Sequence, residues 1–403
     1  MKILSHQIYQ TNLRLIGLCA FFATASLVFA QTWTLTRAAT NYWQSVASSA
    51  DGTILAASAG HQISIGNYSG GVFISTNSGS DWFQANLPAT NFYWGIALSA
   101  DGSRLATTFV YGGVYYSTDF GVTWTFNGTY FPPKFGGLAH TIASSADGTK
   151  LAVASSMIFT STNGGATWAS NNISGPRYAS IASSADGNKL AVASLSDSAI
   201  YLSTDAGMTW TTNDVPNGAF QDIASSADGS ALIAAGSSQV PGPIYTSLNS
   251  GTTWVSNAVS KTAWTAVAAS ADGIVLAGAS GQTSFVHFTN GAWSTNIAPG
   301  QIVSLASSAD GGQLVAAVSG AVQPGNIYTL QFARRPLLSL AASSNDFILS
   351  WLVPSTNFVL QQSSNLISWL DITNTPSLNL VNLHYQVMLS PTNRSGYYRL
   401  ATP

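Results

Sequence analysis

The chain has 403 residues, of which 46% are hydrophobic and only 7% are charged. All 15 acidic residues are aspartates, and the 13 basic residues form no stripe, so the formal net charge is −2. This balance argues against nucleic acid as a partner, because phosphate contacts are made chiefly by clustered Lys and Arg.

The first thirty residues read as an export signal. Lys2 and Arg14 precede the apolar run 15–29, and Val28 and Ala30 form a small-residue cleavage signature. We therefore expect a signal peptide at 1–30, cleaved after Ala30, and a secreted, periplasmic or cell-surface protein. No later segment is long enough to span a membrane, so we expect a mature chain without a transmembrane segment. The single cysteine, Cys19, lies inside the signal, which leaves no disulfide or thiolate metal site after it.

A short motif, "SADG" or a near copy of it, recurs along the chain. A short apolar strand precedes each copy and another follows it, and Asp and Gly supply the backbone conformations of a tight hairpin turn. Such repetition predicts one radially arranged sheet for each copy. The aspartates of the copies are Asp51, Asp101, Asp147, Asp186, Asp228, Asp272 and Asp310.

A second motif follows most copies of the first. It reads "STNSGSDW" at Ser75, "STDFGVTW" at Ser117, "STNGGATW" at Ser161, "STDAGMTW" at Ser203 and "SLNSGTTW" at Ser247. These segments resemble the Asp-box, or BNR, repeat of sialidase-like β-propellers, although Asn77, Asn163 and Asn249 stand where the family has Asp. The resemblance implies that the Asx side chain bonds backbone amides, that Gly takes a positive φ, and that Trp packs the turn onto its sheet.

The seventh repeat, at Asp310, lacks the second motif and a fourth strand. The segment "QTWTLTR" at Gln31 resembles that missing part. We therefore expect 32–37 to lie beside 326–332 and to close the ring, which removes two sheet edges. The prediction is an all-β chain with a seven-bladed β-propeller at 31–335.

The repeat stops after Arg335, and 336–403 alternates apolar and polar residues over several short strands. This pattern predicts a small β-sandwich. With "LSW", "FVLQQSSNL" and "YYRL" as landmarks, the segment also resembles a C-terminal module of secreted bacterial proteins, which implies an accessory or surface-associated domain.

Sialidase chemistry is not expected, because the family pairs a tyrosine with a glutamate and this chain has no glutamate. We expect no catalytic residues, no cofactor and no metal site, since the histidines are scattered. A secreted glycoside hydrolase or lyase that uses aspartates stays open as the alternative. Asp222 is the most unusual acid, because the equivalent position of other repeats holds Ser, Gly, Thr or Ala.

Large aromatic residues stand eight positions before the repeat aspartate in five of the repeats. They either wedge between sheets or form an exposed platform for a sugar or peptide. The sequence thus predicts a monomeric binding or scaffold protein for a glycan or protein ligand. Its candidate ligand residues are Trp43, Tyr93, Tyr178, Phe220 and Trp264, with Trp94, His140, Arg177 and Asp222 as polar neighbours.

Overall fold

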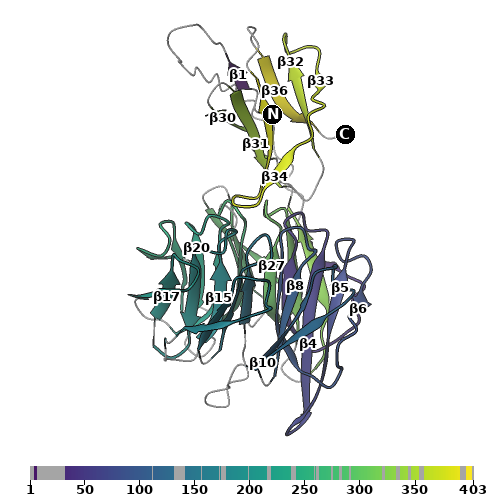
Figure 1. Ribbon diagram of the computed structural model, residues 1–403, viewed down its shortest axis with the longest axis vertical. Helices are drawn as coiled ribbons and strands as arrows, with labels where there is room; N and C mark the ends of the chain where they lie inside the picture. The colour runs from purple at the N-terminus through teal and green to yellow at the C-terminus, as the bar shows by residue number, and fades with distance from the viewer. Residues whose placement is uncertain are drawn as a thin grey trace.

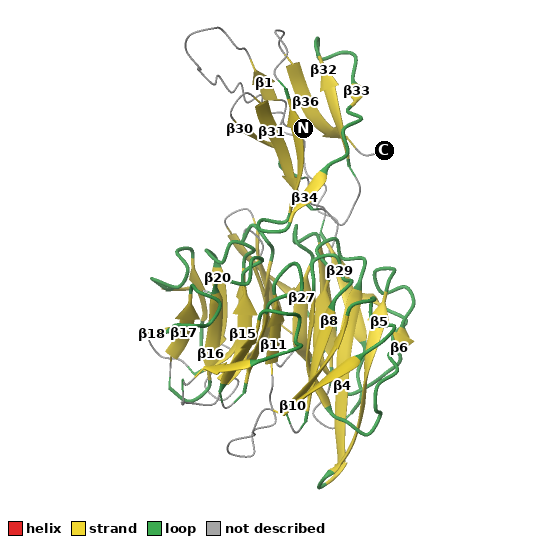
Figure 2. Cartoon of the chain, in the orientation of Figure 1, coloured by secondary structure: helices red, strands yellow, loops and turns green. Residues whose placement is uncertain are grey.

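The computed structural model consists of β-strands, turns and loops, and no helix occurs among its described residues (Figure 2). It describes residues 4–6 and 32–401, except for 111, 131–140, 156, 172, 174–177, 198, 216–218, 237–241, 258, 260–262, 274–275, 281–283, 290–291, 320–322, 333–335, 344–345, 354–357 and 391–395. The larger part of the predicted signal peptide lies outside this range.

Seven four-stranded antiparallel sheets follow one another through the described part of 32–332. We number them sheet 1 to sheet 7 in chain order of their inner strands. The inner strands are β3 (Trp43–Ser48), β7 (Tyr93–Leu98), β11 (Thr141–Ser144), β15 (Tyr178–Ser183), β19 (Phe220–Ser225), β23 (Trp264–Ala269) and β27 (Ile302–Ser307). The second strands are β4 (Leu55–Ser64), β8 (Leu105–Phe109), β12 (Leu151–Ala154), β16 (Leu190–Ser194), β20 (Leu232–Gly236), β24 (Leu276–Ser280) and β28 (Gln313–Val318).

The two outer positions of each sheet hold the remaining strands of this part. The third strands are β5 (Asn67–Ser75), β9 (Gly113–Ser117), β13 (Ile158–Ser161), β17 (Ala199–Ser203), β21 (Ile244–Ser247), β25 (Ser284–Thr289) and β29 (Ile327–Gln331). The outermost strands are β6 (Phe83–Gln84), β10 (Thr125–Tyr130), β14 (Ala169–Asn171), β18 (Thr211–Asp214), β22 (Val255–Ser256), β26 (Ala292–Ile297) and, in sheet 7, β2 (Thr34–Leu35).

The inner strands contact one another in a closed cycle, in which β27 returns to β3. At one end of this cycle the backbones are joined directly, because the alanine before each turn aspartate donates its amide proton to the equivalent carbonyl of the following sheet. The resulting hydrogen bonds, each 2.7 or 2.8 Å long, run from Ala50 to Ala100, then to Ala146, Ala185, Ala227, Ala271 and Ala309, and from Ala309 back to Ala50. We call this cycle the alanine ring.

The turn after each alanine is held by its aspartate. In sheet 1 the Ser49 hydroxyl and the Thr53 amide both donate to Asp51 Oδ1, at 2.6 and 3.0 Å. Gly52 has a φ of 76°, which favours glycine, and a Cβ atom there would lie 2.3 Å from Gln313 Oε1 of sheet 7. The glycine therefore permits both the turn and the close approach of the preceding sheet.

Hydrogen bonds also set the charge state of these turns. Burial tends to raise the pKa of Asp101, but hydrogen bonds from Ser99 and Ser103 outweigh burial and hold that pKa below its ordinary value. The same balance lowers the pKa of Asp228, where Ser230 and Ser226 donate. Asp101 and Asp228 are therefore ionised at neutral pH and stabilise the fold in that form.

The second repeated motif forms the turn that the sequence predicts. Asn77 Oδ1 accepts the Asp81 amide at 2.8 Å, Gly79 has a φ of 90°, and Trp82 Nε1 donates to the Gly79 carbonyl at 3.2 Å. The Ser78 amide donates to the Thr53 carbonyl at 2.9 Å, so this turn lies at the same end of the sheet as the Asp51 turn.

Strand β2, near the start of the described range 32–401, completes sheet 7. Thr34 of β2 pairs with Thr329 of β29, Leu35 pairs with Tyr328, and the Thr36 amide donates to the Ile327 carbonyl at 3.0 Å. Trp33 packs edge-on against Phe285, with ring centroids 5.2 Å apart. The pairing predicted for 32–37 is therefore present.

Two further sheets form a separate unit above the alanine ring (Figure 1). Their shared apolar core includes Leu349, Trp351, Leu360 and Val387. One sheet has the order β30 (Ser339–Ser343), β31 (Asp346–Leu352), β35 (His384–Leu389) and β34 (Ser377–Asn379). The other has the order β1 (Leu4–His6), β36 (Gly396–Ala401), β32 (Val359–Ser363) and β33 (Leu370–Asp371). Strand β1 belongs to the predicted signal peptide.

Removal of residues 31–37 is expected to destabilise the protein, because β29 would become an exposed edge and the Trp33 contact would be lost. We expect a lower midpoint of thermal unfolding by calorimetry and increased aggregation by light scattering. Leu35→Ser is the matched control, because this side chain of β2 is 55% exposed. Equal melting of the truncated and intact proteins would contradict a closing role for β2.

Candidate functional site

The inner strands surround a channel of about 490 Å³. Its wall carries small apolar residues and hydroxyl groups, including Ser45, Ser180, Thr265 and Ser304. Asp222 is the only acidic residue that lines it, and no basic residue does so among the described residues. The channel therefore offers hydrogen-bond donors and acceptors with a single ionisable group.

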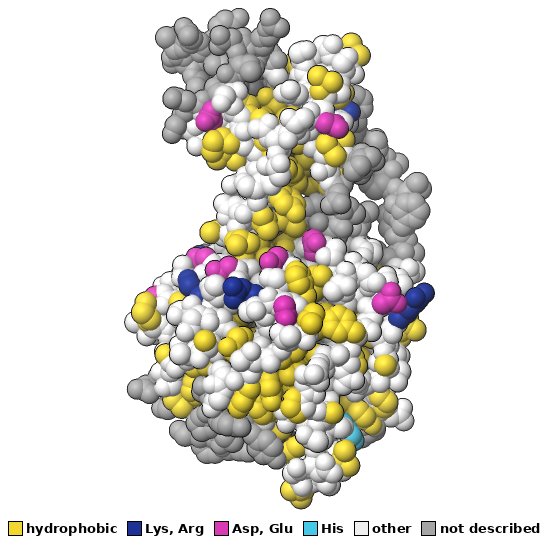
Figure 3. Space-filling model, turned by 45° about the vertical axis from the view of Figure 1, so that its right-hand side comes forward, with side chains coloured by type: hydrophobic (Ala, Val, Ile, Leu, Met, Phe, Trp, Pro, Cys, Tyr) yellow, Lys and Arg dark blue, Asp and Glu magenta, His cyan; other side chains and the backbone are white. Residues whose placement is uncertain are grey.

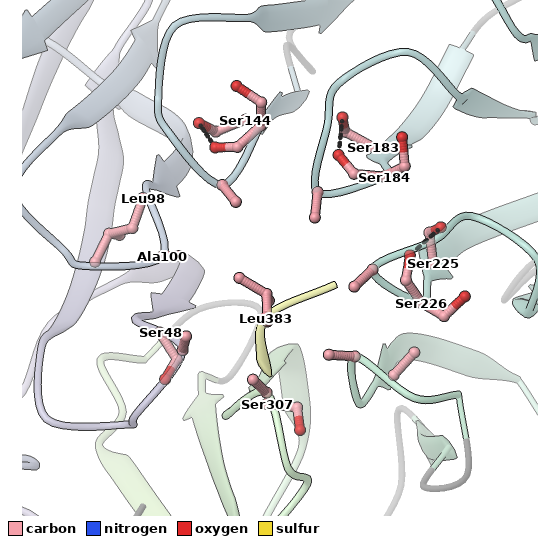
Figure 4. A pocket seen from close by; sticks show the side chains of 18 of the residues that line it. Ser48, Leu98, Ala100, Ser144, Ser183, Ser184, Ser225, Ser226, Ser307 and Leu383 are labelled. Atoms are coloured by element: carbon pink, nitrogen blue, oxygen red, sulfur yellow. Dashed lines mark hydrogen bonds between the residues drawn. The ribbon is translucent and has the colours of Figure 1, made fainter. Parts of the chain in front are cut away.

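A turn of the C-terminal unit reaches into one end of the channel. Leu383, in the turn between β34 and β35, lies at the centre of the opening framed by serines and alanines of the inner strands (Figure 4). The cavity beneath it measures about 160 Å³. Leu352 and Val353 pack beside it in one apolar cluster with Ala50 and Ala309 of the alanine ring.

The turn that carries Leu383 is held by backbone hydrogen bonds. Leu383 has a φ of 58°, its amide donates to the Asn379 carbonyl at 2.8 Å, and its carbonyl accepts the Val353 amide at 3.0 Å. Apolar side chains are exposed at the junction between the two units, and charged side chains gather on the neighbouring rim (Figure 3). The C-terminal unit thus lies against the alanine-ring end of the channel.

Asp222 is held in the channel wall by three hydrogen bonds. Its Oδ1 accepts the Ser180 hydroxyl at 2.6 Å and the Ile223 amide at 2.9 Å, and its Oδ2 accepts the Val267 amide at 2.9 Å. Burial raises its pKa to about 6, although these three hydrogen bonds oppose the rise. Because the donors come from sheets 4, 5 and 6, the carboxyl group links three sheets as well as facing the channel.

A cleft of about 420 Å³ lies at the open end. Gln44, Trp94 and Val303 line both the cleft and the channel, so the two spaces adjoin. Two aromatic pairs shape the cleft. Tyr42 stacks on His61 with ring centroids 4.0 Å apart, and Phe92 lies 4.3 Å from Trp94.

The cleft depends on Gly60, because a Cβ atom there would lie 2.2 Å from the Phe92 ring. The hairpin of β4 and β5 begins at this point and projects beyond the other loops of the open end (Figure 1). Its tip exposes Ile63 by 58% and Ile65 by 99%. The open end therefore combines an aromatic cleft with an exposed apolar hairpin.

The five aromatic residues predicted as a ligand platform are not exposed, which corrects the platform interpretation. Their side chains fill the spaces between sheets, as the alternative interpretation expected; Trp43 donates Nε1–H to the Gly325 carbonyl at 3.0 Å, and Trp264 donates to the Gly242 carbonyl at 3.0 Å. The exposed fractions are 1% for Trp43, 0% for Tyr93, 3% for Tyr178, 0% for Phe220 and 0% for Trp264.

Of the other predicted residues, Trp94 lines the cleft and Asp222 lines the channel, whereas His140 and Arg177 lie outside the described residues. Sequence reasoning missed Tyr42, His61 and Phe92. The sequence does distinguish Tyr42 and Phe92. Only the first two repeats place an aromatic residue directly before the buried aromatic residue, in "NYW" and "NFYW".

No helix among the described residues is long and apolar enough to cross a membrane. No group of three or more His, Cys, Asp or Glu side chains in the described ranges is arranged to hold a metal ion.

No family model matches the chain, and no curated protein matches it. Solved structures do resemble it. YCF48 bound to a D1 peptide is 14% identical with a TM-score of 0.54, and the match covers 75% of this chain and 97% of that one. The β-propeller domain of Cps50 (Swd1) from Myceliophteria thermophila is 13% identical with a TM-score of 0.57, covering 75% and 100%. YCF48 from Cyanidioschyzon merolae is 13% identical with a TM-score of 0.53, covering 74% and 98%.

At these identities the likeness shows the fold alone. Three quarters of the chain is a β-propeller, in agreement with the coarse fold prediction. Membership of the BNR, or sialidase-like, family stays a prediction.

Leu383→Asp is expected to separate the C-terminal unit from the alanine ring, because a carboxylate placed against apolar side chains without a partner is unfavourable. We expect a larger radius of gyration by small-angle X-ray scattering. Val381→Asp is the matched control, since that side chain of the same turn is 57% exposed. Scattering of Leu383→Asp that is indistinguishable from the control would show that Leu383 does not hold the units together.

Asp222→Asn is expected to change how stability depends on pH. A free aspartate has a pKa of about 3.9, so a folded pKa of about 6 means that Asp222 stabilises the fold most below pH 4 and loses this contribution as pH rises through 6. Asp101 and Asp228, whose pKa values are lowered, act in the opposite sense: their stabilising contribution is lost as pH falls below about 4.

The difference in unfolding free energy between wild type and Asp222→Asn should therefore decrease by roughly 2 kcal/mol from pH 4 to pH 7, measured by urea denaturation. Parallel stability curves for the two proteins over this range would exclude a raised pKa at Asp222.

Proposed function

We propose that this chain is an exported, non-catalytic binding or scaffold protein that binds a peptide segment of a protein partner at the open end of its channel. In this proposal the seven sheets are the blades of one seven-bladed propeller at 31–335, completed by β2. Residues 336–403 form a β-sandwich that closes the other end, and 1–30 direct export to the cell surface or beyond.

The observation that carries this proposal is the difference between the two ends of the channel. Leu383 occupies the centre of one end, whereas the other end leads into the cleft beside Trp94. The open end also holds the loops between sheets, and loops on a rigid scaffold are the usual place for recognition residues. Exposed Ile63 and Ile65 beside the cleft add apolar surface of the kind found at protein interfaces.

Propellers of similar fold accord with a binding role. The YCF48 structure contains a bound D1 peptide, and the Cps50 structure is a propeller domain. This likeness supports peptide or protein recognition as a use of the fold, and the particular partner of this chain is part of the proposal.

A glycan is the second candidate ligand, favoured by the two aromatic pairs of the cleft. Sugars bind in concave sites that combine apolar faces with a few polar groups, and Gln44, Gln62 and Gln301 supply such groups here.

A glycoside hydrolase or lyase receives less support. Most glycosidases use a pair of carboxyl groups flanking the scissile bond. Asp222 is the only acid that lines either the channel or the cleft among the described residues, and its carboxyl oxygens are engaged by neighbouring sheets.

Trp94→Ala is expected to weaken ligand binding by about tenfold or more, because it removes a ring shared by the cleft and the channel, with little loss of stability since the ring is only partly buried. The measurement is binding of the purified protein to an array of capped heptapeptides and to a glycan array. Leu248→Ser, a 75% exposed side chain at the opposite end of its sheet, is the control and should leave both binding and stability unchanged.

Binding by wild type that Trp94→Ala does not weaken would place the site elsewhere. Failure of wild type to bind either array would refute the proposed function.

A further inference from the structure

We infer that the partner segment is an extended, uncharged peptide that adds as a strand to the free edge of β4 and places one side chain in the aromatic cleft. This inference rests on the proposed function and specifies its ligand and its mode of binding.

The free edge is the part of β4 beyond its pairing with β3. That pairing ends at Ala59, opposite Trp43, while β4 continues to Ser64 in its pairing with β5. Beyond Ala59 the Gly60 amide donates to the Tyr42 carbonyl at 2.9 Å, and the Gly60 carbonyl accepts Gln44 Nε2 at 3.1 Å. The backbone groups of Gly60 therefore point to the side on which β3 lies.

Backbone groups alternate in direction along a strand, so those of Gln62 point to the same side as those of Gly60. Gln62 pairs with Tyr68 across the hairpin, and no strand lies on its other side in the described part of the chain. Its amide and carbonyl are thus available to a strand from another molecule, which is the basis of recognition by strand addition.

The cleft lies directly beside this edge, since His61 and Gln62 both line it. A strand paired with β4 would direct alternate side chains to the cleft, where the Tyr42–His61 and Phe92–Trp94 pairs offer apolar faces. Among the described residues no Asp, Glu, Lys or Arg lines the cleft, so a charged side chain or chain terminus would enter it without a partner from this part of the chain. An uncharged segment with a central aromatic or aliphatic residue fits these surroundings.

Two further observations favour a polypeptide over a sugar. The hairpin exposes Ile63 and Ile65, which a protein partner would cover. Trp94 Nε1 is buried without a hydrogen-bond acceptor, and a small rotation of the ring toward a backbone carbonyl of the bound segment would supply one.

The test uses Gln62→Pro in the full chain. Proline removes the amide proton of the free edge but breaks no bond of the hairpin, because that amide points away from β5. Gln62→Thr is the matched control, since it also removes the glutamine side chain but keeps the amide. On an array of capped heptapeptides without charged residues, we expect Gln62→Pro to bind at least about tenfold more weakly than Gln62→Thr, and all three proteins to melt alike.

A second measurement examines the peptide instead of the protein. N-methylation of single amides in the best-binding heptapeptide should abolish binding at the one position whose amide faces the Gln62 carbonyl and be tolerated at the two neighbouring positions, because the amides of neighbouring residues point away from β4.

Equal binding by Gln62→Pro and Gln62→Thr, or tolerance of N-methylation at every amide of the peptide, would overturn strand addition while leaving the proposed function intact if Trp94→Ala still weakens binding. Binding of glycans but of no peptide would also overturn the inference, and loss of all binding by wild type would overturn both proposals.

Discussion

The alanine ring is the constraint on which the rest of the structure depends. Each of its backbone hydrogen bonds joins one sheet to the next, and the last returns to Ala50, so no inner strand can move outward without stretching the cycle. The spacing that results is small, which explains why an alanine stands at each of these positions: larger side chains directed at the common axis would collide. The glycines of the adjoining turns also permit close packing between sheets. A Cβ atom at Gly148 or Gly187 would collide with the side chain of Arg104 or Lys150, respectively, from the preceding sheet.

The packing at the alanine ring affects which residues are available for recognition at the opposite end of the channel. Because the sheets converge at the alanine ring, side chains of increasing size are needed between them toward the opposite face, and Trp43, Tyr93, Phe220 and Trp264 fill that space. Their burial means that recognition cannot rest on them. The neighbouring residues Tyr42 and Phe92 are available for recognition instead, because their rings remain partly exposed and line the cleft.

The fold could be predicted well from the sequence, because the same residue types recur at equivalent positions of each repeat. The "SADG" turns, the second motif and the pairing of 32–37 with β29 all follow from residues whose roles are local, namely an Asx side chain, a glycine and a tryptophan within a few positions of one another. The site was predicted only in part. Asp222 and Trp94 were identified, but whether an aromatic ring is wedged between sheets or exposed depends on the alternation of side chains after a β-bulge, as between Trp43 and Ser45, and a sequence does not display that irregularity. The length of β4 could not be predicted from the sequence either, because the segment "GHQISIGNYSGG" has the glycine content of a loop. In the structure, the absence of a side chain at Gly60 lets the hairpin of β4 and β5 continue past Phe92.

The position of Leu383 makes the two ends of the channel unequal. A long polymer that threaded through the ring would meet the Leu383 turn at the alanine-ring end. A chain end, a side branch or a single projecting side chain can enter from the cleft side without passing that turn. The C-terminal unit therefore selects partners by shape, since the middle of an unbranched strand can lie across the mouth of the channel without descending toward Asp222.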